Sequence, residues 1–278
     1  MSERESLLDR FCRYARIDTQ SSATSATYPS TEKQKDLLRV LVDDLKAAGL
    51  ADAAMDEWGY VMATLPSNVP ADHPAHGRVP AIGLIAHVDT YFGVSGANVN
   101  PQVHRDYDGG DIVLPGDGSQ VIRVADETAL AGCRGLTIIT SDGTTLLGAD
   151  DKAGVAVIME TVATLMERRD LPCGPVRICF TCDEEIGRGV LHLHPNRIGA
   201  TVCYTLDGQG ADTIDVETFS ADLAVVEFHG VNIHPSIGKG RMVNAVRAAG
   251  AFVARLPRNG LSPETTDGRE GLLHPYQL

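Results

Sequence analysis

The sequence predicts an α/β fold: a mostly parallel central sheet flanked by helices. Two observations carry this prediction. Four apolar segments of strand length are rich in Val, Ile and Leu, and segments with helical spacing lie between or before them. Strands that alternate with helices form largely parallel sheets, because a parallel connection needs a crossover. The 278 residues are enough for one large α/β domain and part of a second.

Two helices are expected before the sheet begins. Residues 2–17 carry apolar side chains at helical spacing, and residues 18–32 are rich in Ser and Thr, which is typical of a loop. A second amphipathic helix then opens at Thr31 and Glu32, with Gly49 as its expected end.

The strands of the sheet are expected further along the chain. Their segments are YVMATLPS (60–67), VPAIGLIAHVDT (79–90), VRICFTCDEE (176–185) and ATVCYTLDG (200–208). Between the second and third lies a stretch from Tyr91 to about Thr140 that is dense in Gly, Asp and Asn, which indicates loops with short strands such as LTIIT (136–140). A long helix is expected over 153–169.

The pattern changes near Glu217. Residues 223–235 are strand-like, and residues 242–256 have the spacing of a helix. We therefore expect a first domain over 1–217 and the beginning of a smaller α+β domain over 218–278.

Composition excludes some classes of function. The net charge of −13 argues against a nucleic-acid partner, since such proteins need positive charge to bind phosphates. The excess of acidic residues has two interpretations, a solvated surface or carboxylates gathered around cations. Neither a signal peptide nor an apolar stretch of membrane-helix length is present, so we expect no membrane partner and a cytoplasmic location.

The spacing of Cys179 and Cys182 is that of a redox or zinc motif. The pair lies in a predicted strand, however, and no second pair of this spacing exists in the sequence. Buried thiols are the better interpretation.

Polar residues follow the apolar strands at their downstream ends. His87 and Asp89 end one strand, Glu184 and Glu185 follow another, and Asp207 follows the last. In open α/β sheets, ligands bind at the carboxyl ends of the strands. Asp150, with its neighbour Asp151, directly precedes the long helix.

Each of these residues has an ordinary explanation when taken alone. An Asp at a strand end is usually a turn residue or a helix cap, and adjacent acids usually form a solvated turn. Together, however, an imidazole and several carboxylates are the ligands of a pair of zinc ions. Carboxylates brought close to one another would also repel unless cations neutralised them.

Several motifs resemble one known family. AHVDT, GADDKAG, DEEIG and LDG occur in the order typical of the metallopeptidase family that includes peptidase T, carboxypeptidase G2 and the aminoacylases. MATLPSN, GANVNPQ, YDGGDIVL, ITSDGTTLLGADDKAG and HPSIGKGRMVNA are similar to the peptidase T branch, so the resemblance covers essentially the whole chain. It differs after HVDT, where Tyr91, Phe92 and Gly93 replace a usual Ser-Pro-Asp.

The resemblance implies a zinc-peptidase-like catalytic domain that holds two Zn²⁺ per complete subunit. Its implied ligands are His87 and Asp207 for the first zinc, Glu185 for the second, and Asp150 as a bridge between the two. It also implies a cis peptide bond after Asp150.

The resemblance assigns further roles around these ligands. Glu184 would be the general base, and Asp89 would steady His87. His234 would contact substrate from a smaller lid domain, through which the full-length protein would form a homodimer. The implied activity is release of the N-terminal residue from tripeptides by a metal-activated water.

The family pattern also contains a final His ligand for the second zinc, and no residue here matches it; the only histidine after His234 is His274. We therefore expect a C-terminally truncated chain that lacks a return segment of the catalytic domain and is inactive or nearly so. Two alternatives stay open: another hydrolase of the same family, such as a dipeptidase, carboxypeptidase or deacylase, and a catalytically dead binding or dimerisation protein.

Overall fold

The structure, a computed structural model, describes residues 4–210, 213–218 and 220–277. The chain divides into two compact units, Met1–Thr213 and Ile214–Leu278, and each is described by itself. The boundary expected from the sequence, after residue 217, lies close to this division.

A five-stranded sheet forms the centre of the first unit. Its strand order is β1-β2-β8-β3-β9, with bounds Ala54–Met55, Val61–Leu65, Val176–Thr181, Ile82–His87 and Val202–Thr205. Strand β3 pairs in parallel with both β8 and β9, so these three strands end at the same edge of the sheet. All four expected strand segments therefore form strands.

The sheet is mixed, because β2 pairs antiparallel with β8, and β1 antiparallel with β2. The sequence predicts a mostly parallel sheet, and the difference arises in the connection between β2 and β3. Residues 66–81 contain no helix, so the chain returns in the opposite direction instead of making a crossover.

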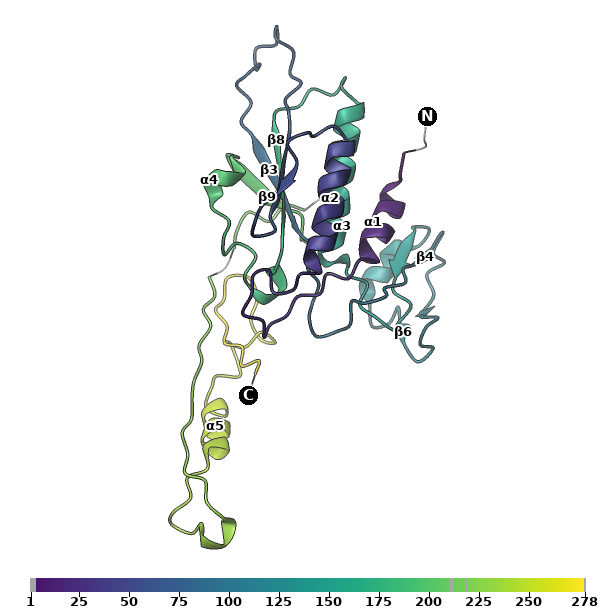
Figure 1. The fold of residues 1–278 in the computed structure, drawn as a ribbon. Coiled ribbons are helices and arrows are strands. Elements are labelled where there is room, and N and C mark those ends of the chain that lie inside the picture. The colour runs from purple at the N-terminus through teal and green to yellow at the C-terminus, as the bar shows by residue number, and fades with distance from the viewer. Residues whose placement is uncertain (1–3, 211–212, 219, 278) are drawn as a thin grey trace. The chain divides into compact units, whose positions relative to one another are not determined.

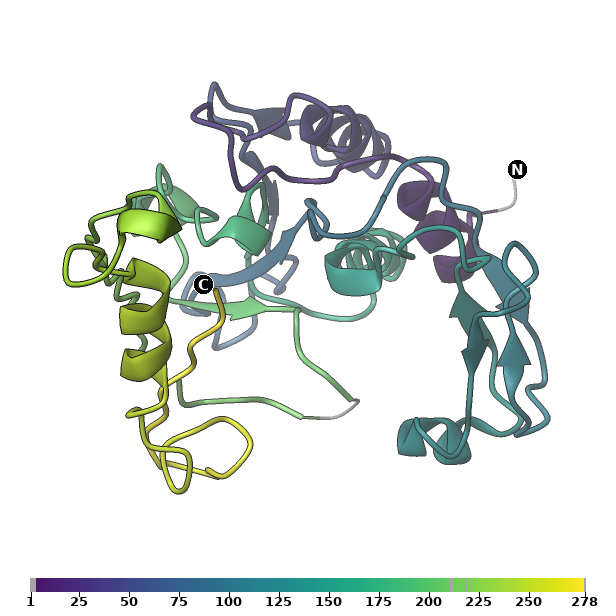
Figure 2. The ribbon, with the colours of Figure 1, turned by 90° about the horizontal axis from the view of Figure 1, so that it is seen from below.

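Helices cover the two sides of the sheet unequally. Helices α1 (Leu7–Ala15), α2 (Gln34–Ala47) and α3 (Ala149–Glu167) lie on one side, and the short α4 (Pro195–Ile198) lies on the other (Figures 1 and 2). The α/β class and the three long helices expected from the sequence are thus confirmed.

The main core lies between the sheet and the helices on its more covered side. Residues of β2 alternate, with Val61, Ala63 and Leu65 buried and the two residues between them partly exposed. The buried residues pack in the same core as the apolar stripe of α2, which includes Leu37 and Leu41. Burying this apolar surface is what fixes the sheet against the helices.

Leu41→Ala should therefore destabilise the first unit. The side chain is fully buried, so its removal loses apolar contacts and leaves a cavity, at a cost of about 2–5 kcal/mol. Urea unfolding followed by circular dichroism measures the change. Leu7→Ala, at a position that is 42% exposed, is the control and should change the unfolding free energy by less than about 0.5 kcal/mol. Equal effects at both positions would contradict this assignment of the core.

The stretch between β3 and α3 forms short elements with a small core of their own. Strand β4 (Gln102–His104) pairs with β7 (Ile138–Thr140), and β5 (Ile112–Val113) pairs with β6 (Val121–Ile122). A 3₁₀ helix, η1 (Thr128–Cys133), lies between β6 and β7 in the sequence. Tyr107, Ile112 and Leu114 form the small core. The expected strand over 136–140 is confirmed as β7.

The second unit contains the helix α5 (Ala245–Val253) and the short 3₁₀ helix η3 (Pro235–Ile237). The helix expected over 242–256 is confirmed, but the strand expected over 223–235 is wrong. Within that segment the described residues form one isolated bridge, between Val231 and Val243. A β-strand needs a partner to satisfy its backbone groups, and here the pairing extends no further.

Cys179 and Cys182 are buried, as expected, and their thiols are not joined. Burial raises the pKa of each thiol, which makes both poor nucleophiles.

Across the residues described, no helix combines the length and apolar character needed to span a membrane.

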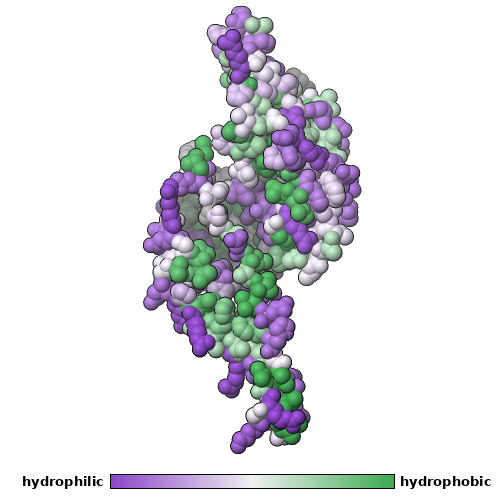
Figure 3. Space-filling model, turned by 90° about the vertical axis from the view of Figure 1, so that its left-hand side faces the viewer, coloured by the Kyte–Doolittle hydropathy of each residue, from purple (hydrophilic) through white to green (hydrophobic). Residues whose placement is uncertain are grey.

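Strand β9 forms one edge of the sheet and is exposed along its length, with Val202 and Tyr204 exposed by 49% and 44%. Figure 3 views the molecule from the side on which α4 lies and shows apolar side chains at the surface among polar ones. An edge strand of this kind leaves backbone hydrogen-bonding groups free to pair.

Candidate metal centre

The polar residues singled out from the sequence converge at one edge of the sheet. His87 is the last residue of β3, and Glu184 opens the 3₁₀ helix η2 (Glu184–Ile186), which follows β8. Asp207 lies just beyond β9. Because these three strands are parallel, their carboxyl ends meet, and this places the side chains together.

The imidazole of His87 lies at the centre of the group and is only 2% exposed. Its Nε2 atom lies 2.9 Å from Asp150 Oδ1, 3.7 Å from Asp207 Oδ2 and 4.0 Å from Glu184 Oε2. One ring nitrogen therefore faces three carboxylates that come from three separate segments of the chain.

Asp89 lies beside the other ring nitrogen of His87, Nδ1, and is fully buried. Its Oδ1 lies 3.2 Å from Nδ1 of His87. The same carboxylate accepts hydrogen bonds from the backbone N–H groups of Glu184, at 2.9 Å, and Glu185, at 3.1 Å. Asp89 therefore orients the imidazole and at the same time fixes the turn that carries both glutamates.

The start of α3 brings in a pair of acids with opposite environments. The Asp150 side chain is 73% exposed, whereas Asp151 is buried. The Asp151 carboxylate accepts hydrogen bonds from the backbone N–H groups of His87, at 3.3 Å, and Gly154, at 3.1 Å. The peptide bond between the two acids is cis, as the family resemblance implied.

Among the residues that the structure describes, two groups have the geometry to hold a metal ion. His87, Asp150 and Glu185 form one group, and His87, Asp151 and Asp207 form the other; in each, the donor atoms lie within 4.8 Å of one another. All four ligands predicted from the sequence are thus brought together. Asp151 was not predicted, and its position beside Asp150 before the helix was the only sign of it in the sequence.

The donor chemistry of this cluster fits divalent cations such as zinc. Imidazole nitrogen and carboxylate oxygen are both zinc ligands, and the crowding of carboxylates favours a cation among them. Burial, together with the nearby Asp150 charge, raises the pKa of Glu185 to about 7. Burial alone would lower the pKa of His87, but the hydrogen bond and charge of Asp89 and the other acids nearby raise it to about 10.

The pKa values of two other acids of the cluster, Asp151 and Asp207, are also raised. Burial raises the pKa of Asp151 to about 8 against the opposing effect of His87. Burial likewise raises the pKa of Asp207 to about 6, with further contributions from Asp150 and Glu184. The negative charge of the cluster is therefore poorly compensated by protein groups alone.

His234 lies in the second unit, where it precedes η3 and accepts a hydrogen bond at Nδ1 from the backbone N–H of Ser236, at 3.3 Å. It belongs to neither of the two metal-binding groups. Its contact with substrate stays a prediction.

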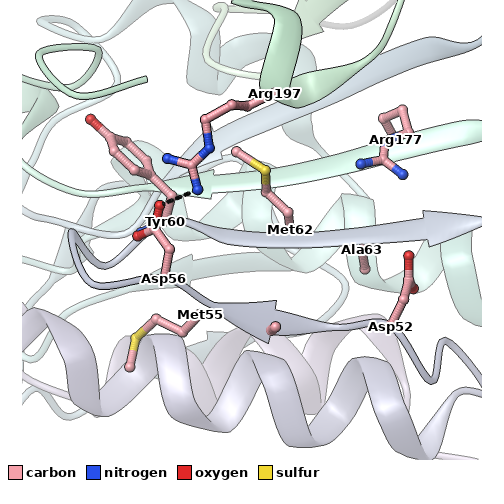
Figure 4. Close-up of a pocket in the computed structure, with 9 residues that line it drawn as sticks. Asp52, Met55, Asp56, Tyr60, Met62, Ala63, Arg177 and Arg197 are labelled. Carbon is pink, nitrogen blue, oxygen red and sulfur yellow. Dashed lines mark hydrogen bonds and ion pairs between the residues drawn. The ribbon is translucent and has the colours of Figure 1, made fainter. Parts of the chain in front are cut away.

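A separate pocket of about 190 Å³ lies on the first unit and contains none of the predicted site residues. It is drawn in Figure 4. Its two arginines are already engaged: Arg197 pairs with Asp56 at 2.7 Å, and Arg177 Nε donates to the carbonyl of Ile198 at 2.7 Å. The pocket is therefore a weaker candidate for the functional site than the acidic cluster.

Comparison with known proteins shows which proteins this chain is similar to. The chain is 48% identical over 271 residues to peptidase T of Shouchella clausii, which covers 98% of this chain and 64% of the relative. Peptidase T of Listeria welshimeri is 45% identical over 275 residues, with 99% and 65% covered. The chain thus spans slightly less than two thirds of these curated relatives.

Two further comparisons concern the domains and the fold. Residues 216–273 match the family model of the peptidase dimerisation domain. The crystal structure of aminopeptidase PepT from Bacillus cereus is similar, with a TM-score of 0.56 and 22% identity over 92% of this chain and 58% of that one. A tripeptidase from Staphylococcus aureus gives the same TM-score and identity, with 92% and 56% covered. At this identity the two structures show the fold alone, whereas the curated relatives show that nearly the whole chain is similar to peptidase T, at 45% to 48% identity.

Proposed function

We propose that the chain carries the metal centre of a zinc-dependent aminopeptidase that releases the N-terminal residue from tripeptides. The observation that carries the proposal is that His87 lies beside carboxylates from three other segments. The chain that brings them together is 48% identical to a peptidase T. The roles proposed for the domains follow the family resemblance: residues 1–217 would belong to the catalytic domain, and residues 218–278 to a lid and dimerisation domain.

Four residues would hold the metal ions. His87 and Asp207 would bind the first zinc and Glu185 the second, with Asp150 shared between them. Two zinc ions, when bound, lower the pKa of a water molecule and polarise the scissile carbonyl. In support, three of these side chains, His87, Asp150 and Glu185, already place donor atoms within 4.8 Å of one another.

Glu184 is the proposed general base. Its side chain is 54% exposed and its Oε2 lies 4.0 Å from His87 Nε2, so the carboxylate is both next to the cluster and open to substrate. It would take the proton of the attacking water and pass it to the leaving amine. Asp89 supports this role because it holds the backbone of Glu184 while orienting His87.

Other parts of the proposal concern the whole protein. His234 would contact the peptide, and the match of residues 216–273 to a dimerisation domain supports a homodimer at full length. The proposed location is the cytoplasm. Nucleic acid and membrane are not among the proposed partners.

The activity is tested with a chimera in which this chain replaces the matched part of the Shouchella clausii peptidase T. With zinc added, we expect it to hydrolyse tripeptides from the N-terminal end and to leave dipeptides and N-acylated amino acids largely intact. The 278-residue chain alone is assayed beside it. Preferential cleavage of dipeptides, C-terminal residues or acyl groups would replace the proposal by another hydrolase of the family, and loss of all turnover on exchange of this part would favour a binding role.

A further inference from the structure

Asp183 is a buried carboxylate for which the proposed reaction has no role. It is fully shielded from solvent and lies directly before Glu184. Its oxygens accept three hydrogen bonds, from the Ser30 backbone N–H at 2.6 Å, the Ser30 hydroxyl at 2.5 Å and Gln34 Nε2 at 2.7 Å. Its own backbone N–H donates to Gln34 Oε1 at 3.1 Å.

These contacts join distant parts of the chain around one turn. All the partners of the carboxylate are neutral donors from the loop before α2 and from the first residue of that helix. The three hydrogen bonds satisfy the buried carboxylate and fix its position relative to that loop and helix.

The backbone of Asp183 sets the direction of the glutamate turn. Its φ of 60° and ψ of 27° are left-handed, and the chain reverses there as it passes from β8 into η2. The reversal points the N–H groups of Glu184 and Glu185 at the Asp89 carboxylate. The turn is therefore held from two sides, by Asp89 on the side of the metal cluster and by the contacts of Asp183 on the other.

The loop that supplies Ser30 is itself anchored. The Tyr28 hydroxyl lies 2.5 Å from the Tyr60 hydroxyl, and the Tyr28 ring packs edge-on against His192 at 4.7 Å between ring centroids. Arg188, just after η2, donates to the carbonyl of Ser25 at 2.9 Å. Ser30 is thus a fixed point against which the turn can be positioned.

We propose that Asp183, held by Ser30 and Gln34, is a positioning residue that sets the orientation of Glu184 and Glu185 toward the metal cluster. The proposal rests on the proposed function, because it is zinc binding by Glu185 and proton transfer by Glu184 that need this orientation. Its role is indirect: the side chain acts through the backbone of the turn and touches neither substrate nor metal.

Asp183→Asn in the 278-residue chain tests the proposal with zinc alone as the probe. The variant keeps the size of the side chain but turns one acceptor oxygen into a donor, which opposes the N–H of Ser30 or Gln34 Nε2. Changes to groups that orient metal ligands typically weaken metal affinity by about 10- to 100-fold, and we expect a loss of this size by calorimetry. Hydrogen exchange should also accelerate at the amides of Glu184 and Glu185 and stay unchanged in β3.

Asp44→Asn is the matched control. The Asp44 carboxylate also joins two elements, accepting from Arg13 at 2.8 Å and from the Tyr14 hydroxyl at 2.6 Å, but it lies between α1 and α2. It should lower stability without changing zinc affinity or exchange in the turn. Ser30→Ala removes one of the three hydrogen bonds to the carboxylate and should weaken zinc binding in the same direction as Asp183→Asn, but less. If Asp183→Asn does not fold, Ser30→Ala tests the proposal in its place.

Two outcomes would overturn the proposal. The first is an Asp183→Asn variant in which both zinc affinity and amide exchange are those of the wild type. The second is an Asp44→Asn variant that loses as much zinc affinity as Asp183→Asn. A wild-type chain that binds no zinc would contradict the proposed function instead. Exchange at Glu184 and Glu185 would still decide whether Asp183 positions the turn.

Discussion

Glu184→Gln should leave the metal content unchanged and abolish most of the turnover of the active chimera. The change keeps the shape of the side chain and removes the oxygen that accepts the proton. General base catalysis contributes about 100- to 10,000-fold, so kcat should fall by that factor while KM changes little. Steady-state kinetics on a tripeptide, with zinc measured by atomic emission on the same samples, checks both halves of the expectation.

Glu167→Gln is the control for this change. The Glu167 side chain is exposed to a similar degree, 57% against 54% for Glu184. Glu167 is the last residue of α3, away from the cluster, and pairs with Arg4. Its variant should turn over at the wild-type rate. An unchanged rate in Glu184→Gln would show that another group takes the proton.

In the chimera, Asp150→Ala should release both zinc ions. The proposed centre shares this carboxylate between the two metals, so its removal takes one ligand from each site at once. His87 Nε2, which lies 2.9 Å from Asp150 Oδ1, would also lose its nearest carboxylate. Equilibrium dialysis against zinc, followed by atomic emission, gives the number of ions per chain.

The matched control for this loss is Asp170→Ala, an acid 62% exposed that pairs with Arg168 beyond the end of α3. It should keep the wild-type number of ions. If Asp150→Ala also kept them, Asp150 would not be a shared ligand, and the group of His87, Asp151 and Asp207 would become the better candidate for a single metal site.

Much of this arrangement was predictable because it follows from the strands. The apolar run that ends in His87 and the run that precedes Glu184 both read as buried strands, and parallel strands bring their ends together. The placement of Asp207 follows from the same rule for β9. The specific roles of these residues came from the family resemblance and stay predictions.

Other features depend on long-range contacts that spacing does not reveal. The direction of β2 depends on how residues 66–81 return, and composition is silent on this. Asp151 looks like a solvated neighbour of Asp150, yet it is buried because its carboxylate satisfies the N–H of His87. Asp183 looks like a third acid in a charged turn, whereas its partners lie about 150 positions earlier in the sequence.

In the second unit, the sequence predicts a strand over residues that do not form one. Residues 223–235 have the composition of a strand, but strand propensity expresses how a residue fits a paired, half-buried surface. In the described part of this unit Val225 is 79% exposed and the pairing is limited to the bridge of Val231. A β pattern without a partner therefore did not become a strand.

The most direct test of the metal centre is to crystallise the 278-residue chain with zinc and collect data at the zinc absorption edge. The account predicts an anomalous peak within about 2.0–2.2 Å of His87 Nε2 and of a carboxylate oxygen of Asp150 or Asp207, the usual zinc–ligand distance. Well-ordered His87 and Asp150 side chains with no peak between them, or zinc bound only at other residues, would contradict it.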